Sequence, residues 1–132
     1  MTVRQDMVNG HGSCHGGFLA TLADSAFAFA CNTYGDVTVA SGFDITFVAP
    51  ALLGDLLVAD AVERARFGRS GLYDVTVSCQ RGSDRTVIAE FRGRSRSLRR
   101  AHLTSGRIDT PDGAAMPTDL DQTSTVVDRS AP

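Results

Sequence analysis

The chain has 132 residues and a formal net charge of −2, with 42% hydrophobic and 21% charged residues. This length and balance predict one soluble globular domain with a sizeable core, and the lack of a basic excess argues against nucleic-acid binding. All 13 basic residues are arginines, which excludes Schiff-base chemistry, a pyridoxal-phosphate lysine, a P-loop and an S-x-x-K nucleophile, because each needs a lysine amine.

Targeting signals are missing from the sequence as given. The first residues, MTVRQDMVNGHG, contain no apolar signal-peptide region, and no apolar run approaches the ~18 residues of a membrane span. The three cysteines are odd in number and show no C-x-x-C spacing. We therefore expect a cytoplasmic protein with reduced thiols and no membrane contact.

The first distinctive segment is the loop NGHGSCHGG, residues 9–17, which leads into a helix. Glycines permit close backbone approach, and the first N–H groups of a helix have no intrahelical partner. Such groups, aided by the helix dipole, suit a carbonyl oxygen that becomes an oxyanion. The alternative is an ordinary glycine-rich loop in which Ser13 caps the helix.

Two other interpretations of this loop are weaker. His11, Cys14 and His15 are zinc-ligand types, but a structural site needs a second ligand pair, and none follows downstream. Cys14 as a nucleophile lacks a supporting context, and a small buried thiol is the commoner role. The loop also lacks the third glycine of a dinucleotide fingerprint, so we expect no metal and no cofactor.

Apolar residues recur at three- and four-residue spacing over residues 17–33, which predicts a helix. The segment is apolar almost all round and should therefore be buried on most sides. Asp24 interrupts it, and a carboxylate in such a place costs several kcal/mol unless it is paired or has a task. A functional carboxylate and an Asp that caps a neighbour or faces solvent remain alternatives.

The period then changes to two, which predicts strands over residues 39–48, 56–66, 72–80 and 86–98. Short turns at 67–71 and 81–84 join them. One helix followed by such strands predicts an α+β fold, an antiparallel sheet with its helix on one face. From residue 99 to 132 the periodicity is lost, so we expect a domain over 1–98 and a disordered tail.

Arginines alternate along the last predicted strand, so Arg92, Arg94 and Arg96 share one face. Together with Arg66 and Arg69 in the preceding turn, they are candidates for bidentate phosphate binding. The alternative is a solvated strand face.

The sequence resembles a known family. NGHGSCHGGFLATLADSAFAFACN, ASGFDITFVAPALLGD, SGLYDVTV and FRGRS, within about residues 1–98, are similar to the PaaI-like phenylacetyl-CoA thioesterases. The resemblance implies the hotdog fold, an antiparallel sheet wrapped around one long helix. It also implies hydrolysis of phenylacetyl-CoA and hydroxyphenylacetyl-CoA thioesters. The sequence departs from the family at its start, because members carry a further N-terminal helix and most of a first strand before the segment that matches Met1. Either the start is misassigned or this form lacks an outer strand, in which case we expect lower stability and impaired activity.

The resemblance carries roles to individual residues. Asp24 matches the catalytic carboxylate, which acts as nucleophile or as base for water. Gly16 matches the glycine whose N–H polarises the thioester carbonyl, His15 helps to shape that oxyanion site, and Asn9 matches a loop residue near the acyl pocket. In the family, the N-terminal helix that this sequence lacks supplies an Asn implicated in catalysis, and no residue of the given sequence replaces it.

Gly16 and Asp24 are eight residues apart, about 12 Å along a helix, so they cannot meet over one carbonyl carbon. A C2 homodimer with antiparallel helices would bring Asp24 of one chain to Gly16 of the other, and pairing of dimers into a tetramer stays open. The acyl-CoA would lie between subunits. Its acyl group would contact Phe18, Phe27 or Phe43, and its remaining contacts are assigned to Gly17, Arg66, Arg69, Ser70, Gly71, Arg92, Gly93, Arg94 and Ser95.

Two alternatives remain. Hotdog hydratases or dehydratases pair the Asp with a His usually five residues later, but that position is Phe29. A non-catalytic acyl-CoA-binding or sensing domain has no need of Asp24, although an absent N-terminal segment would favour it.

Overall fold

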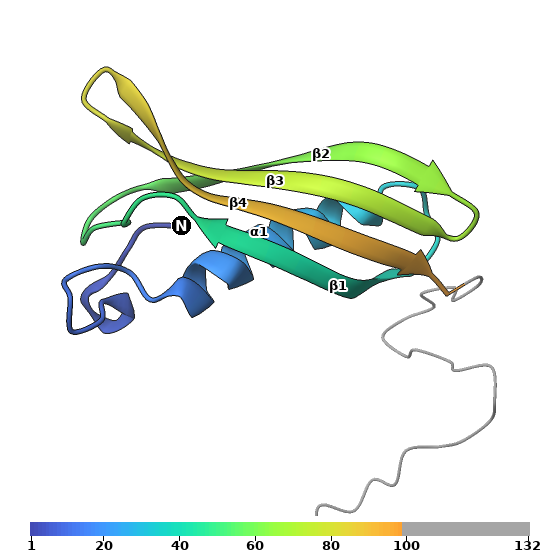
Figure 1. Ribbon diagram of the computed structural model, residues 1–132, viewed down its shortest axis with the longest axis horizontal. Coiled ribbons are helices and arrows are strands. Elements are labelled where there is room, and N and C mark those ends of the chain that lie inside the picture. The colour runs from blue at the N-terminus through green and yellow to red at the C-terminus, as the bar shows by residue number, and fades with distance from the viewer. Residues whose placement is uncertain (99–132) are drawn as a thin grey trace, which may run out of the picture. The chain divides into compact units, whose positions relative to one another are not determined.

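The computed structural model describes residues 1–98, and the tail expected from residue 99 lies outside this part. A short 3-10 helix (Gln5–Met7) precedes helix α1 (Gly16–Cys31). Four strands follow: β1 (Thr38–Phe47), β2 (Leu57–Phe67), β3 (Ser70–Arg81) and β4 (Asp84–Ser97). They form one antiparallel sheet in the order β1-β4-β3-β2 (Figure 1). The predicted α+β fold is confirmed, and α1 and the four strands begin and end within about two residues of their expected bounds. The 3-10 helix was not predicted.

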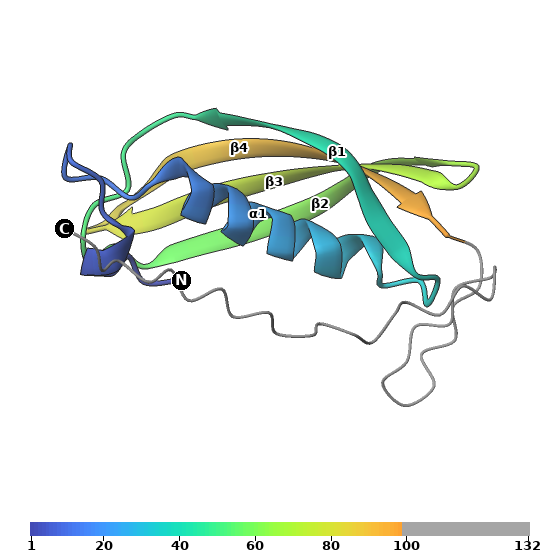
Figure 2. The ribbon, with the colours of Figure 1, turned by 90° about the horizontal axis from the view of Figure 1, so that it is seen from below.

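Helix α1 lies along one face of this sheet (Figure 2). Its buried residues follow a four-residue spacing and form one stripe: Leu19, Ala23, Phe27 and Cys31. The sheet meets this stripe with alternate residues of β3, and four of these residues are buried: Tyr73, Val75, Val77 and Cys79. Phe27 joins the two layers, because its ring centroid lies 5.5 Å from that of Tyr73 and 5.8 Å from that of Phe91.

The expectation that the helix is buried on most sides is wrong for a single chain. The sheet covers one side of α1, and no other described element covers the opposite side (Figure 2). Phe29 is therefore 80% exposed and Phe18 is 37% exposed. One protomer leaves an apolar helix surface open to solvent.

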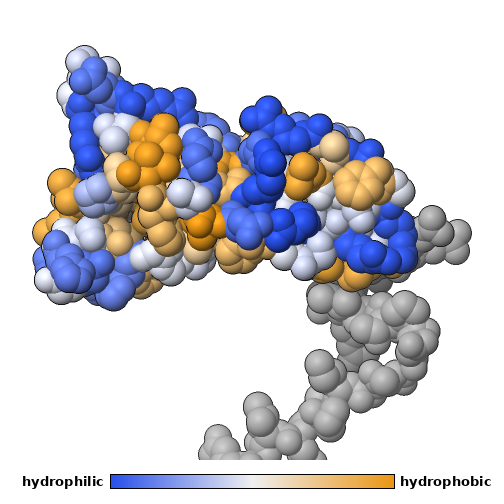
Figure 3. Space-filling model, in the orientation of Figure 1, coloured by the Kyte–Doolittle hydropathy of each residue, from blue (hydrophilic) through white to orange (hydrophobic). Residues whose placement is uncertain are grey.

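The face of the sheet turned away from α1 carries charged side chains, and hydrophilic residues gather over much of it (Figure 3). Asp74 on β3 accepts hydrogen bonds from Arg64 on β2 (2.8 Å) and from Arg92 on β4 (2.7 and 2.9 Å). Arg94 on β4 donates to Asp44 on β1 at 2.7 Å. These pairs tie all four strands together across this face.

In the described part of the chain, no helix has the length and apolar character needed to cross a membrane.

Candidate active site

Asn9 organises the loop that leads into α1. Its Oδ1 accepts hydrogen bonds from the N–H groups of His11 (2.9 Å) and Ser13 (3.3 Å), and its Nδ2 donates to Ser13 Oγ at 3.2 Å. Ser13 is therefore bound to Asn9, and α1 has no side-chain cap at His15. This rules out the interpretation of Ser13 as a helix cap, and it shows that the amide of Asn9 serves the shape of the loop.

The N–H groups at the start of α1 differ in availability. The Cys14 N–H donates to Ala51 O and the His15 N–H donates to Met7 O, both at 2.8 Å. Gly16 is the first helical residue, and its N–H has no intrahelical acceptor. The helix dipole places partial positive charge at this point, so the N–H groups of Gly16 and Gly17, which have no intrahelical acceptor, are available to a carbonyl oxygen.

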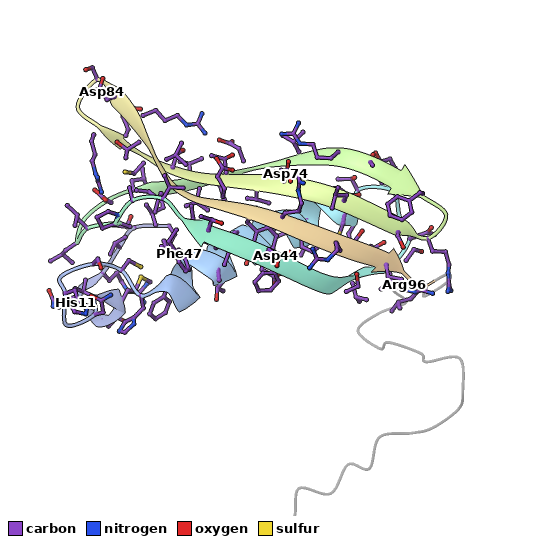
Figure 4. The ribbon with its side chains drawn as sticks, viewed as in Figure 1. His11, Asp44, Phe47, Asp74, Asp84 and Arg96 are labelled. Atoms are coloured by element: carbon purple, nitrogen blue, oxygen red, sulfur yellow. The ribbon has the colours of Figure 1, made fainter. Side chains whose placement is uncertain are left out.

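A groove runs beside Gly16. It is lined by the loop before the helix, by Leu19 and by the segment that ends β1: Asn9, Ser13, Cys14, Phe47, Val48, Ala49, Pro50 and Ala51. The Phe47 ring lies directly against Gly16, because a Cβ added to Gly16 would stand 2.7 Å from Phe47 Cζ. Figure 4 shows Phe47 beside the start of α1 and His11 at the tip of the loop. A side chain at position 16 would require the Phe47 ring or the start of α1 to move.

The contribution of Phe47 and of residues 48–51 to the groove was missed in the sequence. No local pattern in residues 47–51 indicates that the end of this strand returns to the helix N-terminus.

Asp24 is half-buried in the middle of α1. Among residues 1–98 its carboxylate has no cationic partner within ion-pair distance and accepts no side-chain hydrogen bond. It stands eight residues, about 12 Å along the helix, from Gly16. One chain therefore carries both groups on one helix but does not bring them together.

The three phenylalanines assigned to the acyl group lie in different places. Phe18 and Phe43 are 37% and 42% exposed, and the Phe43 ring stacks on Phe91 at 4.8 Å. Phe27 is 1% exposed and lies in the core, so within one protomer it is closed to an acyl group. The periodicity of the helix could not show which of its phenylalanines faces the sheet.

Three further residues of the predicted substrate site lie in the core, where neighbouring side chains pack closely against them. A Cβ on Gly93 would stand 2.8 Å from the Phe27 ring, and a Cβ on Gly71 would stand 2.7 Å from both Tyr73 and Ser95 Oγ. Ser95 is itself buried. These positions face α1 on the inner side of the sheet, and their small size is explained by packing.

The arginines divide into two groups. Of the nine arginines within residues 1–98, six form ion pairs with carboxylates: Arg4, Arg64, Arg81, Arg85, Arg92 and Arg94. The other three pair with no carboxylate in this part of the chain, and they lie at the end of the sheet formed by the β2–β3 turn and the end of β4: Arg66, Arg69 and Arg96.

Arg66 and Arg69 line a hollow at this end of the sheet, beside the C-terminus of α1. The guanidinium of Arg66 stacks on the Tyr34 ring, 3.8 Å from its centroid. The other lining residues are mostly polar: Cys31, Asp36, Thr38, Gly68, Ser70, Gly71, Tyr73 and Ser97. The single phosphate-binding face expected from five arginines is thus divided, because Arg92 and Arg94 are paired on the opposite face of the sheet.

Cys14 is buried, and its Sγ contacts His15 O at 3.6 Å. Burial raises the pKa of the Cys14 thiol, which disfavours the thiolate that a nucleophile needs. The described residues contain no cluster of three His, Cys, Asp or Glu side chains arranged to hold a metal ion.

Comparison with known proteins gives the class. Residues 11–86 match the family described as the thioesterase superfamily. Acyl-coenzyme A thioesterase PaaI of Escherichia coli (strain K12) is 45% identical over 98 residues, which cover 74% of this chain and 68% of that protein. The chain therefore belongs to the thioesterase superfamily, within which it is PaaI-like.

Solved structures agree. The E. coli PaaI protein from the phenylacetic acid degradation operon superposes with a TM-score of 0.70, over 74% of this chain and 69% of that chain. A mutant of the phenylacetic acid degradation protein PaaI from Thermus thermophilus gives a TM-score of 0.67 at 38% identity, over 74% and 80%. The hotdog fold and the resemblance to PaaI-like thioesterases are confirmed.

A more distant protein, from Streptococcus mutans UA159, was solved bound to acetyl CoA. It is 24% identical, has a TM-score of 0.68, and covers 74% of this chain and 76% of its own. At this identity the likeness extends to the fold.

Proposed function

We propose that this chain hydrolyses aromatic acyl-CoA thioesters of the phenylacetyl-CoA and hydroxyphenylacetyl-CoA type to the free acid and CoA. One observation carries the proposal. A chain of the thioesterase superfamily presents, on the same helix, an available Gly16 N–H and an Asp24 carboxylate that has no cationic partner among residues 1–98. The names of its relatives, an acyl-coenzyme A thioesterase and phenylacetic acid degradation proteins, support the substrate class.

The complete site needs a second copy of the chain. Gly16 and Asp24 are about 12 Å apart along α1, whereas reacting groups must lie about 3 Å from one carbonyl carbon. A C2 pair with antiparallel helices places Asp24 of one copy opposite Gly16 of the other. The exposed apolar side of α1 supports such a pair, since burial of Phe18 and Phe29 would stabilise it.

The reaction follows from these two groups. The Gly16 N–H donates to the thioester oxygen and stabilises the negative charge that develops there. As base, Asp24 takes a proton from a water molecule while the water oxygen bonds to the carbonyl carbon. The C–S bond then breaks, the CoA thiolate leaves with its electron pair, and the proton passes to it. As nucleophile, an Asp24 carboxylate oxygen would instead bond to the carbonyl carbon, and the C–S bond would break as the CoA thiolate leaves with its electron pair. Water would then hydrolyse the resulting anhydride to the free acid and the Asp24 carboxylate, and the proton released would pass to the thiolate.

Candidate contacts for the acyl group and for the CoA part of the substrate lie at different places in the domain. Phe18 and Phe43 are exposed aromatic surfaces for the acyl group. Of the three arginines without a carboxylate partner among residues 1–98, Arg66 and Arg69 line one hollow, and we assign these two to the phosphates of CoA. Arg92 and Arg94 are already committed to Asp74 and Asp44, so we assign them to the sheet.

Hydrolysis of a panel of acyl-CoAs, followed by release of free thiol, tests the proposal. We expect phenylacetyl-CoA and hydroxyphenylacetyl-CoA to give higher kcat/KM than straight-chain esters of similar size. Higher rates with the straight-chain esters would contradict the aromatic assignment. Tight binding of acyl-CoA without release of thiol would instead support the non-catalytic binding domain.

A further inference from the structure

We infer that Arg81, at the end of β3, is a positioning residue that holds one wall of the thioester groove against the start of α1. The inference rests on the function proposed above. Arg81 lies outside the groove itself, and its side chain acts through residues 50–55, the segment between β1 and β2.

One nitrogen of Arg81 closes this segment at both ends. Arg81 Nη2 donates to Pro50 O at 2.8 Å and to Asp55 Oδ2 at 2.6 Å. The same carboxylate oxygen accepts the N–H of Leu52 at 2.8 Å. The Asp55 side chain is only 14% exposed and that of Arg81 33%, so the pair is shielded from water. Residues 50–55 are thus closed into a ring by an ion pair.

The segment in turn holds the loop before the helix. Ala51 is fully buried, and its carbonyl accepts the N–H of Cys14 at 2.8 Å. Ser13 and Leu52 form an isolated antiparallel bridge next to this contact. Cys14 stands two residues before Gly16, and Pro50 and Ala51 line the groove beside Gly16. A continuous path of hydrogen bonds and peptide units therefore runs from Arg81 to the proposed oxyanion donor.

The charges of the pair support this role. The hydrogen bond from Arg81 lowers the pKa of the Asp55 carboxyl, so Asp55 is ionised at neutral pH and the pair is intact where the enzyme would work.

Three variants test whether Arg81 acts through these hydrogen bonds. Arg81→Met removes both hydrogen bonds and keeps much of the apolar volume. Arg81→Lys restores them, because both come from a single nitrogen that an ammonium can replace. Arg85→Met is the matched control, since Arg85 lies on the same hairpin and its hydrogen bonds go to Asp60 and Ser78, which lie outside residues 50–55.

We expect Arg81→Met to lower kcat on phenylacetyl-CoA about tenfold, because a shift of the oxyanion donor by a fraction of an ångström weakens stabilisation of the transition state. KM should stay within about twofold, since the proposed phosphate contacts lie at the opposite end of the sheet. Arg81→Lys should recover most of kcat, and Arg85→Met should keep it. All rates are measured at a temperature where each variant is fully folded by circular dichroism.

Amide hydrogen exchange gives a readout that does not depend on catalysis. The N–H of Cys14 should exchange at least several-fold faster in Arg81→Met than in wild type, and at the wild-type rate in Arg85→Met. Unchanged exchange of Cys14, or an unchanged kcat in folded Arg81→Met, would overturn the inference. A wild-type protein with no thioesterase activity would remove the proposed function instead, and Cys14 exchange would still decide whether Arg81 positions the loop.

Discussion

Aspartate carboxylates are paired with arginines on the outer face of the sheet, whereas, within residues 1–98, the one on helix α1 is not. On the outer face, Asp74 is held by Arg64 and Arg92, and Asp44 by Arg94, and Figure 4 shows both carboxylates on that face. On the helix side, Asp24 has no cationic partner within residues 1–98. These carboxylates on both sides of the sheet belong to aspartates, so the difference lies in their surroundings. Charges that the chain pairs by itself serve its stability, whereas a shielded charge that it leaves unpaired indicates a ligand or a second copy.

The strongest test of this contrast replaces one carboxylate on each side of the sheet by an amide. Asp24→Asn keeps the shape and removes the charge, so kcat on phenylacetyl-CoA should fall by ~10² or more with little change in binding. Asp44→Asn makes the same chemical change on the outer face and should leave kcat within about twofold of wild type. Equal activity of the two variants would show that Asp24 has no catalytic role.

Two neighbouring glycines give the next contrast. Gly16→Ala places a Cβ 2.7 Å from Phe47 Cζ and must displace the ring or the start of the helix, whereas Gly17→Ala meets nothing within 4 Å. We expect kcat to fall about tenfold in Gly16→Ala and to change less than twofold in Gly17→Ala, as measured by thiol release. A larger loss in Gly17→Ala would move the oxyanion donor away from Gly16.

The arginines allow a comparison of substrate binding. Arg66→Gln and Arg69→Gln should each raise KM for phenylacetyl-CoA about five- to tenfold at low salt, because each removes a cation proposed to meet a phosphate. Arg94→Gln, which loses an arginine already paired with Asp44, should change KM less than twofold. A thioester of N-acetylcysteamine, which has no phosphate, provides the control, and its KM should be unchanged in all three variants. A KM that rises for both esters would indicate disturbed folding in place of lost phosphate contacts.

Loss of an ion pair on the outer face should lower the free energy of unfolding and leave kcat unchanged. Hydrogen bonds from Arg92 and Arg64 lower the pKa of Asp74 to about 2. Because the folded-state pKa lies below the unfolded value of about 3.9, this stabilisation is present above about pH 5 and disappears as the pH falls towards 2. Asp74→Asn should lower the free energy of unfolding by about 1 to 2 kcal/mol at pH 7, allowing for the half-exposed arginines.

Denaturant unfolding at two pH values checks this prediction. The difference between wild type and Asp74→Asn should shrink to under about 0.5 kcal/mol near pH 2. A difference of the same size at both pH values would show that Asp74 stabilises the sheet by something other than its charge.

The smallest effect is expected beyond the described residues. Deleting residues 101–132 should leave the melting temperature and kcat nearly unchanged, because their composition lacks the apolar content of a core segment. A fall of several degrees in the melting temperature would show that this segment docks on the domain.

The elements were predictable because their signals are local. Helix α1 and the four strands follow from apolar periods of about 3.6 and 2, and the turns from Gly, Ser and Asp. Asp24 stood out for the same reason, as a charge inside an apolar helical repeat. The resemblance to a known family added the roles of Gly16 and Asp24 but could not show how one chain places them.

What the sequence could not show depends on strand register. Alternation put Arg92 and Arg94 on one face, but only the register brings Asp74 and Asp44 next to them. Phe27 lies beneath Gly93 because the helix packs at one rotation on the sheet, which the nearly uniform apolar surface of α1 left undetermined. The link from Arg81 to Pro50 joins residues 31 positions apart and has no local signal.

The central claim is that each catalytic site uses Gly16 of one copy and Asp24 of the other. The direct test is co-expression of two inactive chains, Asp24→Ala and Gly16→Pro. The proline removes the N–H, but its Cβ would press on the Phe47 ring, so both chains also carry Phe47→Leu, and that single variant sets the reference activity. Random pairing yields half mixed dimers with one intact site of two, so about a quarter of the reference activity should return. No recovery in isolated mixed dimers of folded chains would contradict the shared site.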